Sequence, residues 1–387
     1  MAYYFYLNKK IMKNLDRTEI QDSIITKLPI PAHGILEISM RVGKGRITIE
    51  QIKREDCKSI LWVTPSTTLR DKDVPEEFIK WGGEDYLKVT DIICYGSLHK
   101  HKGSYDKIIL DELQHITEAN SEPFFNGNIT YNSILGLTGT MPKIQEKLDL
   151  ISLLKLKTLH EITIEEAVDL DLVSDFKITM LETKLNATDK YIKGGTKAKP
   201  FMTTERATYN YLDKKCKYSF VTKNATLSKI FISKRMHFVY NLPSKVEATK
   251  KLLKSFKKGE RTIIFAGSIE SSKLIHDFTF NSKTDDTYLK AFKAEEIDTL
   301  VLVKSGGTGH TFKNVHNIII TQVDSNKSGL VSQKFGRGLL KNDDGSIVNI
   351  YIIYCNDTVD EKWALRAIED RDNDKIDFYK FNEYIKI

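Results

Sequence analysis

An apolar run ends in two acidic residues in the stretch Lys107-Ile108-Ile109-Leu110-Asp111-Glu112-Leu113-Gln114-His115. A buried strand of this kind would present both carboxylates at the carboxyl edge of a sheet, where open α/β sheets bind their ligands. One carboxylate could hold Mg²⁺ through oxygen contacts, and its neighbour could orient or deprotonate a water. Because an isolated Asp-Glu pair is usually a solvated turn, its meaning depends on the rest of the chain.

The chain repeats this alternation of apolar runs and helix-compatible stretches in two series. The first series has apolar runs at 34–39, 59–63, 91–94, 107–110 and 133–137, and the second has them at 262–266, 299–303, 317–321 and 347–354. Strands that alternate with helices predict mostly parallel sheets covered by helices. We therefore expect an α/β protein with a first domain at 1–165, a linker with a basic, aromatic insertion at 166–240, and a second domain at 241–387.

A glycine-lysine loop follows the first predicted strand. Gly43 and Lys44 stand between that strand and a helix-like segment at 47–54. A strand, a glycine turn and a helix start place backbone N–H groups around an anion, and Lys44 would reach the β- and γ-phosphates of a nucleotide. The usual phosphate-loop pattern also has a first glycine and a final hydroxyl residue, and these positions hold Ile38 and Gly45 here.

Small polar loops follow other predicted strands. One is Thr64-Pro65-Ser66 and another is Tyr95-Gly96-Ser97, and such loops could contact a sugar-phosphate backbone. The segment 137–142, which reads Leu-Thr-Gly-Thr-Met-Pro, ends a further strand. Its two hydroxyls could link the Asp-Glu pair to neighbouring elements by hydrogen bonds, although the sequence alone favours a plain turn.

Two segments of the second series are further candidates. The glycine-rich loop 304–310 follows the run 299–303 and permits close approach of the backbone to a ligand. Gln333 and Arg337 lie in a helix-like segment between two strands. An arginine there could neutralise charge on a transferring phosphoryl group. Taken alone, that segment is more simply a solvated helix surface.

The charge distribution favours an anionic partner. The 387 residues carry a net charge of +7, and thirteen Lys or Arg stand against three Asp or Glu between Thr183 and Arg235. Aromatic residues are interleaved with these charges, among them Tyr191, Phe201, Tyr209, Tyr211, Tyr218 and Phe220. Basic groups can neutralise phosphates, and aromatic rings can stack on unpaired bases. A solvated helical insertion whose aromatic residues form a small local core explains the same composition equally well.

Composition also narrows the class of protein. The sequence has no window of eighteen apolar residues, so no membrane span or membrane partner is expected, and its N-terminus has no apolar signal core. Cys57, Cys94, Cys216 and Cys355 are far apart and fit a reducing compartment. We expect a cytoplasmic protein, in the host cytoplasm if it is encoded by a phage.

Taken in order, these segments resemble the motifs of superfamily 2 helicases and translocases, especially compact phage-type and restriction-type members. Arg17 and Gln21 are similar to the adenine-reading Arg-x-x-x-Gln element of that family. Eight further segments follow in the order of motifs I, Ia, Ib, II, III, IV, V and VI: 43–44, 64–66, 95–97, 111–115, 137–142, 263–266, 305–309 and 333–337. The resemblance implies two tandem RecA-like P-loop NTPase domains, each a mostly parallel sheet flanked by helices.

The resemblance also implies an ATP-dependent DNA helicase or translocase that uses ATP and Mg²⁺ between its two domains. The residues implied to bind the nucleotide or its metal are Gln21, Gly43, Lys44, Gly45, Gly309 and Asp111, the last as the Mg²⁺ ligand. Those implied to act in hydrolysis are Glu112, Gln333 and Arg337, and those implied to contact nucleic acid are Thr64, Ser66, Ser97 and Thr308. The expected partner is single-stranded or branched DNA, with RNA as the other candidate.

The chain departs from the family's pattern at several positions: Arg41 stands where the family has Gly, and His115 is displaced by one residue from the histidine of motif II. Gly45 stands where the family has Thr or Ser, and Leu340 stands where motif VI has a second arginine. Two other hypotheses therefore stay open. One is a nucleic-acid-binding accessory protein that keeps the helicase fold with weak or lost ATPase activity, and the other is a nucleotide-binding regulator with no nucleic-acid role.

Overall fold

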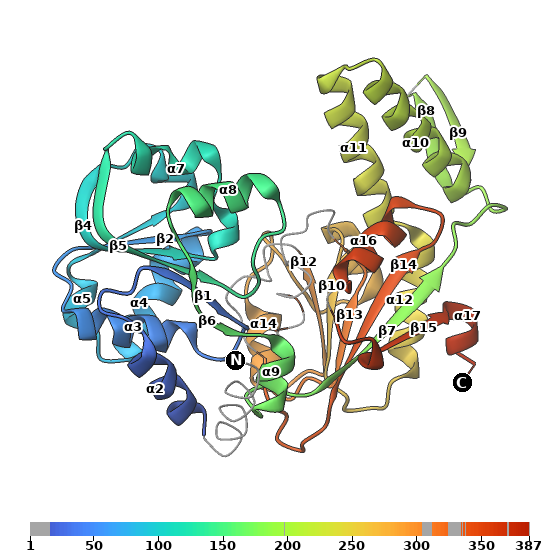
Figure 1. Cartoon of the computed structure of the whole chain (residues 1–387). Helices are drawn as coiled ribbons and strands as arrows, with labels where there is room; N and C mark the ends of the chain where they lie inside the picture. The colour runs from blue at the N-terminus through green and yellow to red at the C-terminus, as the bar shows by residue number, and fades with distance from the viewer. Residues whose placement is uncertain are drawn as a thin grey trace. The chain divides into compact units, whose positions relative to one another are not determined.

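The computed structural model describes residues 16–196, 198–303, 312–323, 334, 336, 338–369 and 371–386 (Figure 1). The chain forms two compact units. The first extends to Ser174, with Gly336 counted in it, and the second begins at Asp175. Each unit is built on its own parallel sheet, so the predicted α/β class is confirmed. In the described ranges, no helix is long and apolar enough to cross a membrane.

The first unit has a six-stranded parallel sheet in the order β3-β2-β4-β5-β1-β6. Its strands are β1 (Gly34–Ile38), β2 (Ile60–Thr64), β3 (Thr90–Cys94), β4 (Gly103–Asp111), β5 (Ile129–Thr138) and β6 (Thr158–Ile162). Its helices are α2 (Arg17–Lys27), α3 (Lys44–Glu55), η1 (Leu69–Asp73), α4 (Val74–Lys80), α5 (Glu84–Leu87), α6 (Tyr95–Leu98), η2 (Leu113–His115), α7 (Glu118–Phe125), α8 (Gln145–Leu153) and α9 (Ile164–Asp169). Because β4, β5 and β1 are neighbours, the loops that follow them leave the same edge of the sheet.

The second unit has a seven-stranded parallel sheet in the order β11-β12-β10-β13-β14-β7-β15. Its strands are β7 (Phe176–Thr183), β10 (Thr262–Ala266), β11 (Thr279–Phe280), β12 (Thr299–Val303), β13 (Asn317–Ile320), β14 (Val348–Cys355) and β15 (Ile376–Lys380). Helices α12 (Pro243–Ser255), α13 (Ile269–Ile275), α14 (Thr287–Lys293), α16 (Val359–Ala367), η4 (Asn373–Lys375) and α17 (Phe381–Tyr384) accompany it.

Every predicted apolar run is a strand of one of the two sheets. Four described strands of these two sheets were not predicted: β6, β7, β11 and β15. β6 and β15 are edge strands with exposed positions, so neither has a continuous apolar run. β7 lies inside the range predicted as a linker, and it pairs with β14 from Phe176 opposite Val348 to Thr183 opposite Cys355.

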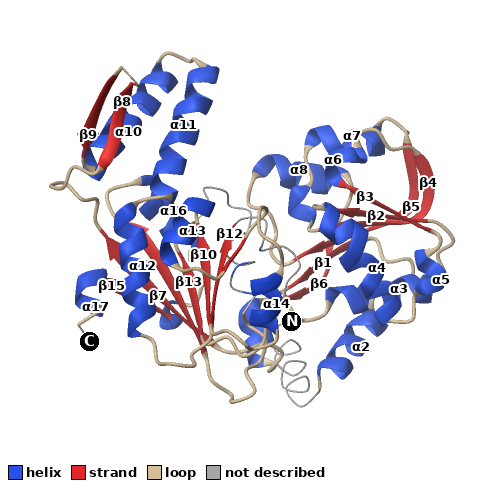
Figure 2. Cartoon of the chain, turned by 180° about the vertical axis from the view of Figure 1, so that it is seen from behind, coloured by secondary structure: helices blue, strands red, loops and turns tan. Residues whose placement is uncertain are grey.

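An insertion, residues 192–240, separates β7 from α12 (Figure 2). It begins with the antiparallel hairpin of β8 (Ile192–Thr196) and β9 (Lys199–Thr203). The helical hairpin of α10 (Glu205–Val221) and α11 (Ala225–Tyr240) follows. Asp213 of α10 joins the two helices through an ion pair with Arg235 of α11. The basic, aromatic composition noted in the sequence thus belongs to a folded module of the second unit.

Candidate nucleotide site

Glycine shapes the loop between β1 and α3. Gly43 caps α3 with a φ of 112°, a left-handed conformation that residues with a Cβ atom rarely adopt. A Cβ atom at Gly43 would also lie 2.0 Å from Nε2 of Gln21, so that side chain would have to move. Helix α3 begins at Lys44, and its first backbone N–H groups have no partner within the helix. The loop therefore has the backbone form of an anion-binding turn.

Lys44 has a buried charged end with no hydrogen-bond partner among the described residues. Its Nζ atom lies beside the loop that follows β5, 3.6 Å from the position of a Cβ atom built on Gly139. It also interacts electrostatically with Asp111. Because a buried ammonium without a hydrogen-bond partner is costly, this atom indicates an anion-binding position that the described residues leave unfilled.

Gln21, which is expected to read adenine, lies buried against the same loop. Its Nε2 donates to the carbonyl of Val42 at 2.6 Å, and its Oε1 accepts from Nη1 of Arg46 at 2.8 Å. The other terminal nitrogen of Arg46 reaches Asp22 at 2.7 Å. Both ends of the Gln21 amide therefore hold the loop against α2, and the contact with adenine stays a prediction.

Gly45 occupies the position at which phosphate loops usually carry a hydroxyl. A Cβ atom there would meet Oε2 of Glu77, from α4, at 2.6 Å. The indole N–H of Trp81 donates to this same oxygen at 2.8 Å. Since the contacted atom is the far end of a flexible side chain, a larger residue at position 45 would displace Glu77 and leave the backbone in place.

The Asp-Glu pair ends a buried strand, as predicted. Asp111 is the last residue of β4, and Glu112 follows with a φ of 52°, in the left-handed region. Burial, together with the charge of Glu112, raises the pKa of Asp111 to about 7, against the opposing effect of Lys44. Two neighbouring carboxylates resist ionising together, and a bound cation would relieve that conflict.

The chemistry of Asp111 suits magnesium that arrives with a nucleotide. Within the described ranges, histidine, cysteine and carboxylate side chains form no group of three or more that could hold a metal ion. Mg²⁺ commonly binds through one or two carboxylates and takes its remaining ligands from phosphate and water. Asp111 therefore fits this role better than that of a ligand in a resident metal centre.

Gln114 fixes the carboxylate of Glu112. Its Nε2 donates to Oε2 of Glu112 at 2.6 Å, and its Oε1 accepts from the hydroxyl of Thr138 at 3.0 Å. Thr138 is the last residue of β5, so the link between the Asp-Glu stretch and the segment 137–142 is present. Gln114 was not among the predicted site residues. The signal that could have identified Gln114 in the sequence is its position two residues after Glu112, at the turn that ends the strand.

Solved structures resemble this chain, although no protein-family model and no curated protein matches its sequence. The Pyrococcus furiosus Hef helicase domain is 14% identical with a TM-score of 0.50, covering 91% of this chain and 98% of that one. The DNA-bound ATP-dependent Type ISP restriction-modification enzyme LlaBIII is 12% identical with a TM-score of 0.60, covering 96% and 32%. An S. cerevisiae Dbp5 variant bound to RNA and ADP BeF3 is 9% identical with a TM-score of 0.57, covering 95% and 92%.

The chain shares a helicase-like fold with these three structures. Its two parallel sheets are the tandem RecA-like domains of that fold. The site of Lys44, Asp111 and Glu112 lies entirely in the first of them. Four predicted residues lie outside the described residues: Thr308, Gly309, Gln333 and Arg337.

The strand-end loops of the helicase fold differ in exposure. Thr64 is buried, and its hydroxyl donates to the carbonyl of Ser66 at 3.0 Å. The hydroxyl of Ser66 accepts from the backbone N–H of Leu69 at 3.3 Å. Ser97 is exposed on α6. Thr64 and Ser66 therefore shape their own loop, and Ser97 is the side chain of the three that is open to a partner.

Tyr95 is a buried neighbour of the site that sequence reasoning missed. Its hydroxyl has no hydrogen-bond partner among the described residues. Burial raises its pKa well above the usual value, and the charges of Asp111 and Glu112 add to the effect. The loop 95–97 was interpreted as a nucleic-acid contact, and no sequence signal separates a buried Tyr95 from an exposed one.

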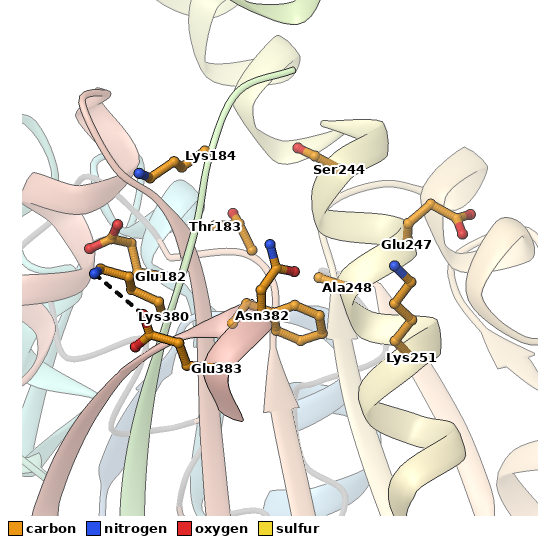
Figure 3. A pocket seen from close by; sticks show the side chains of 11 residues that line it. Glu182, Thr183, Lys184, Ser244, Glu247, Ala248, Lys251, Lys380, Asn382 and Glu383 are labelled. Carbon is orange, nitrogen blue, oxygen red and sulfur yellow. Dashed lines mark hydrogen bonds and ion pairs between the residues drawn. The ribbon is translucent and has the colours of Figure 1, made fainter. Parts of the chain in front are cut away.

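A separate pocket lies in the second unit, at the carboxyl ends of β7 and β15 (Figure 3). It has a volume of about 430 Å³. Six of its lining residues are charged, three of each sign: Lys184, Lys251, Lys380, Glu182, Glu247 and Glu383. Lys380 pairs with Glu383 at 3.4 Å. The charged lining residues balance in number, and none of the predicted site residues lines the pocket.

Proposed function

We propose that this protein hydrolyses ATP at the site of Lys44, Asp111 and Glu112 and thereby moves along or unwinds DNA. The observation that carries the proposal is the buried Lys44 ammonium, which has no hydrogen-bond partner in the described part of the chain and interacts with Asp111. An anion held by this lysine and the glycine turn would lie beside two carboxylates. This combination of groups suits a hydrolysis in which water attacks the bound phosphate group.

Each residue of the site then has one task. Lys44 and the first N–H groups of α3 bind phosphate oxygens. Asp111 holds Mg²⁺, which neutralises charge on the phosphates when it is bound. Glu112 orients the attacking water and accepts its proton, with its carboxylate held by Gln114. Gln333 and Arg337 are proposed as γ-phosphate sensors on the family resemblance alone.

Nucleic acid is the proposed partner. The LlaBIII structure contains DNA and the Dbp5 structure contains RNA. The net charge of +7 also favours a polyanion. Single-stranded or branched DNA is the proposed track, with RNA as the other candidate.

The test is phosphate release from ATP and Mg²⁺ by the purified protein, with no nucleic acid, a single-stranded DNA, a forked duplex, and an RNA of the same sequence. We expect hydrolysis that rises severalfold when the preferred nucleic acid is present. If the protein bound nucleic acid but released no phosphate under any condition, the enzyme hypothesis would be refuted and the accessory-protein hypothesis would remain. Hydrolysis without any nucleic-acid binding would leave the nucleotide-binding regulator.

The glycine at position 45 favours the second candidate, an accessory protein with weak ATPase activity. A residue at this position normally ligates Mg²⁺ through a hydroxyl, which glycine lacks. We therefore expect Gly45→Thr to increase ATP turnover and to lower the Mg²⁺ concentration needed for half-maximal rate. The added Cβ would meet only the flexible end of Glu77. Gly45→Ala controls for the Cβ atom. Equal Mg²⁺ dependence in the two variants would show that the hydroxyl has no role.

Gln114→Ala is expected to reduce ATP turnover by about ten- to a hundredfold while nucleotide affinity stays nearly constant, since a hydrogen bond to a charged group contributes roughly 1.5–3 kcal/mol. The variant removes the donor that fixes Glu112 and touches neither Lys44 nor Asp111. Rapid-quench phosphate release and binding of a fluorescent ATP analogue measure the two quantities. Gln145→Ala is the matched control, because that glutamine donates to Asp149 on α8 at 2.8 Å. Equal turnover in both variants would contradict a role for Gln114.

A further inference from the structure

The insertion 192–240 is seated firmly on the second unit. Glu205, at the start of α10, is fully buried, and its two carboxylate oxygens accept from the backbone N–H groups of Asn186 and Ser244, both at 2.8 Å. These residues lie just before and just after the insertion. The hydroxyl of Tyr209 accepts from the backbone N–H of Val359 at 2.8 Å. The helical hairpin is therefore a fixed projection of the second unit (Figure 1).

The core of the insertion accounts for only part of its aromatic residues. On α10, Tyr209, Leu212 and Cys216 are buried at helical spacing. Tyr211 is 58% exposed and Tyr218 is 61% exposed on the same helix. Exposure of apolar side chains continues at the end of α10, where Val221 is 81% exposed. The local-core explanation from the sequence therefore holds for one face of α10 and fails for the other.

The exposed face combines rings with lysines at regular spacing. Tyr211, Lys214 and Tyr218 follow one another at intervals of three and four residues, so they share one face of α10. Seven residues of helix separate the two tyrosines by about 10 Å. Lys215 places its Nζ atom 5.7 Å from the centre of the Tyr211 ring, which puts a cation beside an exposed π-surface.

The acidic side chains of the insertion are engaged in contacts within the protein. Glu205 is buried against two backbone N–H groups. Asp213 pairs with Lys217 at 2.8 Å and also with Arg235. These two are the acidic residues of the range 192–240, which contains many more lysines. The exposed face of α10 therefore presents positive charge with rings between the charges.

We propose that the exposed face of α10, with Tyr211, Lys214 and Tyr218, binds an unpaired nucleic-acid strand. The rings stack on bases, whose faces are accessible only when the strand is unpaired, and the lysines contact phosphates. A protein partner fits less well, because lysine is depleted from the centre of protein interfaces. The inference rests on the proposed function only in taking nucleic acid as the partner, and it requires no ATP.

The experiment compares wild type with the double variant Tyr211→Ser/Tyr218→Ser, using fluorescence anisotropy without nucleotide. The probes are a single-stranded thymidine oligonucleotide and an abasic oligonucleotide of the same length. We expect the double variant to bind the thymidine strand about ten- to a hundredfold more weakly, since each stacked base contributes roughly a factor of ten. Affinity for the abasic strand should be equal in both proteins, because only the bases reach the rings.

A matched control is Phe125→Ser. Phe125 is an exposed ring, at 50%, in a groove whose other lining residues include Glu118, Glu122, Glu146 and Asp149. Carboxylates around a ring repel a phosphate backbone, so this variant should bind both strands as wild type does. All three substituted residues are at least half exposed, and unchanged thermal midpoints would show that the fold is intact.

The outcomes separate this inference from the proposed function. Wild type and the double variant could bind the thymidine strand equally well and both hydrolyse ATP faster with DNA. That result would refute strand binding by α10 and leave the proposed helicase function intact. Tyrosine-dependent binding with no hydrolysis would support the surface and refute the enzyme. If light scattering showed that wild type self-associates through the two tyrosines and strand binding did not change, α10 would be a protein interface and the inference would fail.

Discussion

Glu112→Gln is expected to lower ATP turnover by roughly 10²–10⁴-fold, the usual contribution of a positioned general base. The substitution keeps the size of the side chain and removes its ability to accept a proton. ATP affinity should stay nearly constant, because phosphate binding is assigned to Lys44 and to the loop before it. Single-turnover phosphate release measures the first quantity, and titration with a fluorescent ATP analogue measures the second.

Glu122→Gln is the control for that experiment, since it removes an exposed carboxylate from α7 of the same unit. It should hydrolyse ATP as wild type does. If turnover of Glu112→Gln stayed close to that of Glu122→Gln, Glu112 would not be the base. In that case the left-handed backbone at Glu112 would have only a structural role.

The second large effect concerns stability. Asp360→Ala is expected to destabilise the second unit by about 3–5 kcal/mol, because it leaves a buried ammonium without its counter-ion. Nζ of Lys245 lies 2.7 Å from Oδ2 of Asp360, with side-chain exposures of 2% and 0%. The same oxygen accepts from the backbone N–H of Cys355 at 2.9 Å, so the variant also loses a hydrogen bond at the end of β14.

Amide hydrogen exchange of β14, followed by mass spectrometry, measures this loss within the second unit. Glu247→Ala is the control, since it breaks the exposed pair between Lys250 and Glu247 on α12. That change should have little effect on exchange. Replacing both buried partners, as Lys245→Met/Asp360→Leu, should recover most of the loss. Unchanged exchange in Asp360→Ala would show that the buried pair does not stabilise the sheet.

Sequence reasoning located the strands that are continuous apolar runs, including the edge strand β3, which is only partly buried. It missed β15 and β6, which lie at sheet edges and have exposed positions. It also missed β7, whose polar residues at Lys177 and Glu182 interrupt the apolar pattern. Edge and interrupted strands are specified by their neighbours in the sheet, and those neighbours are far away in sequence.

The nucleotide site was partly predictable for a related reason. Lys44, Asp111 and Glu112 each follow an apolar run directly, so the parallel sheet brings them to one edge. The role of Gln114 was hidden, because the family resemblance implied roles only for Asp111 and Glu112 in that segment. The left-handed turn at Glu112 directs Gln114 inward and leaves His115 exposed. The face of α10 that Tyr211 occupies was equally hidden, since tyrosines stand on both sides of that helix.

The buried carboxylate of Glu205 has a mechanical consequence. It ties the chain segments on either side of the insertion at a single point, next to the end of β7 and the start of α12. Helix α10 extends from that point for about 25 Å, given 1.5 Å per residue. Tension on a nucleic-acid strand bound near Tyr218 would therefore act as a torque about Glu205 and reach the carboxyl edge of the second sheet. A rigid helix would transmit this force, whereas a flexible linker of equal length would not.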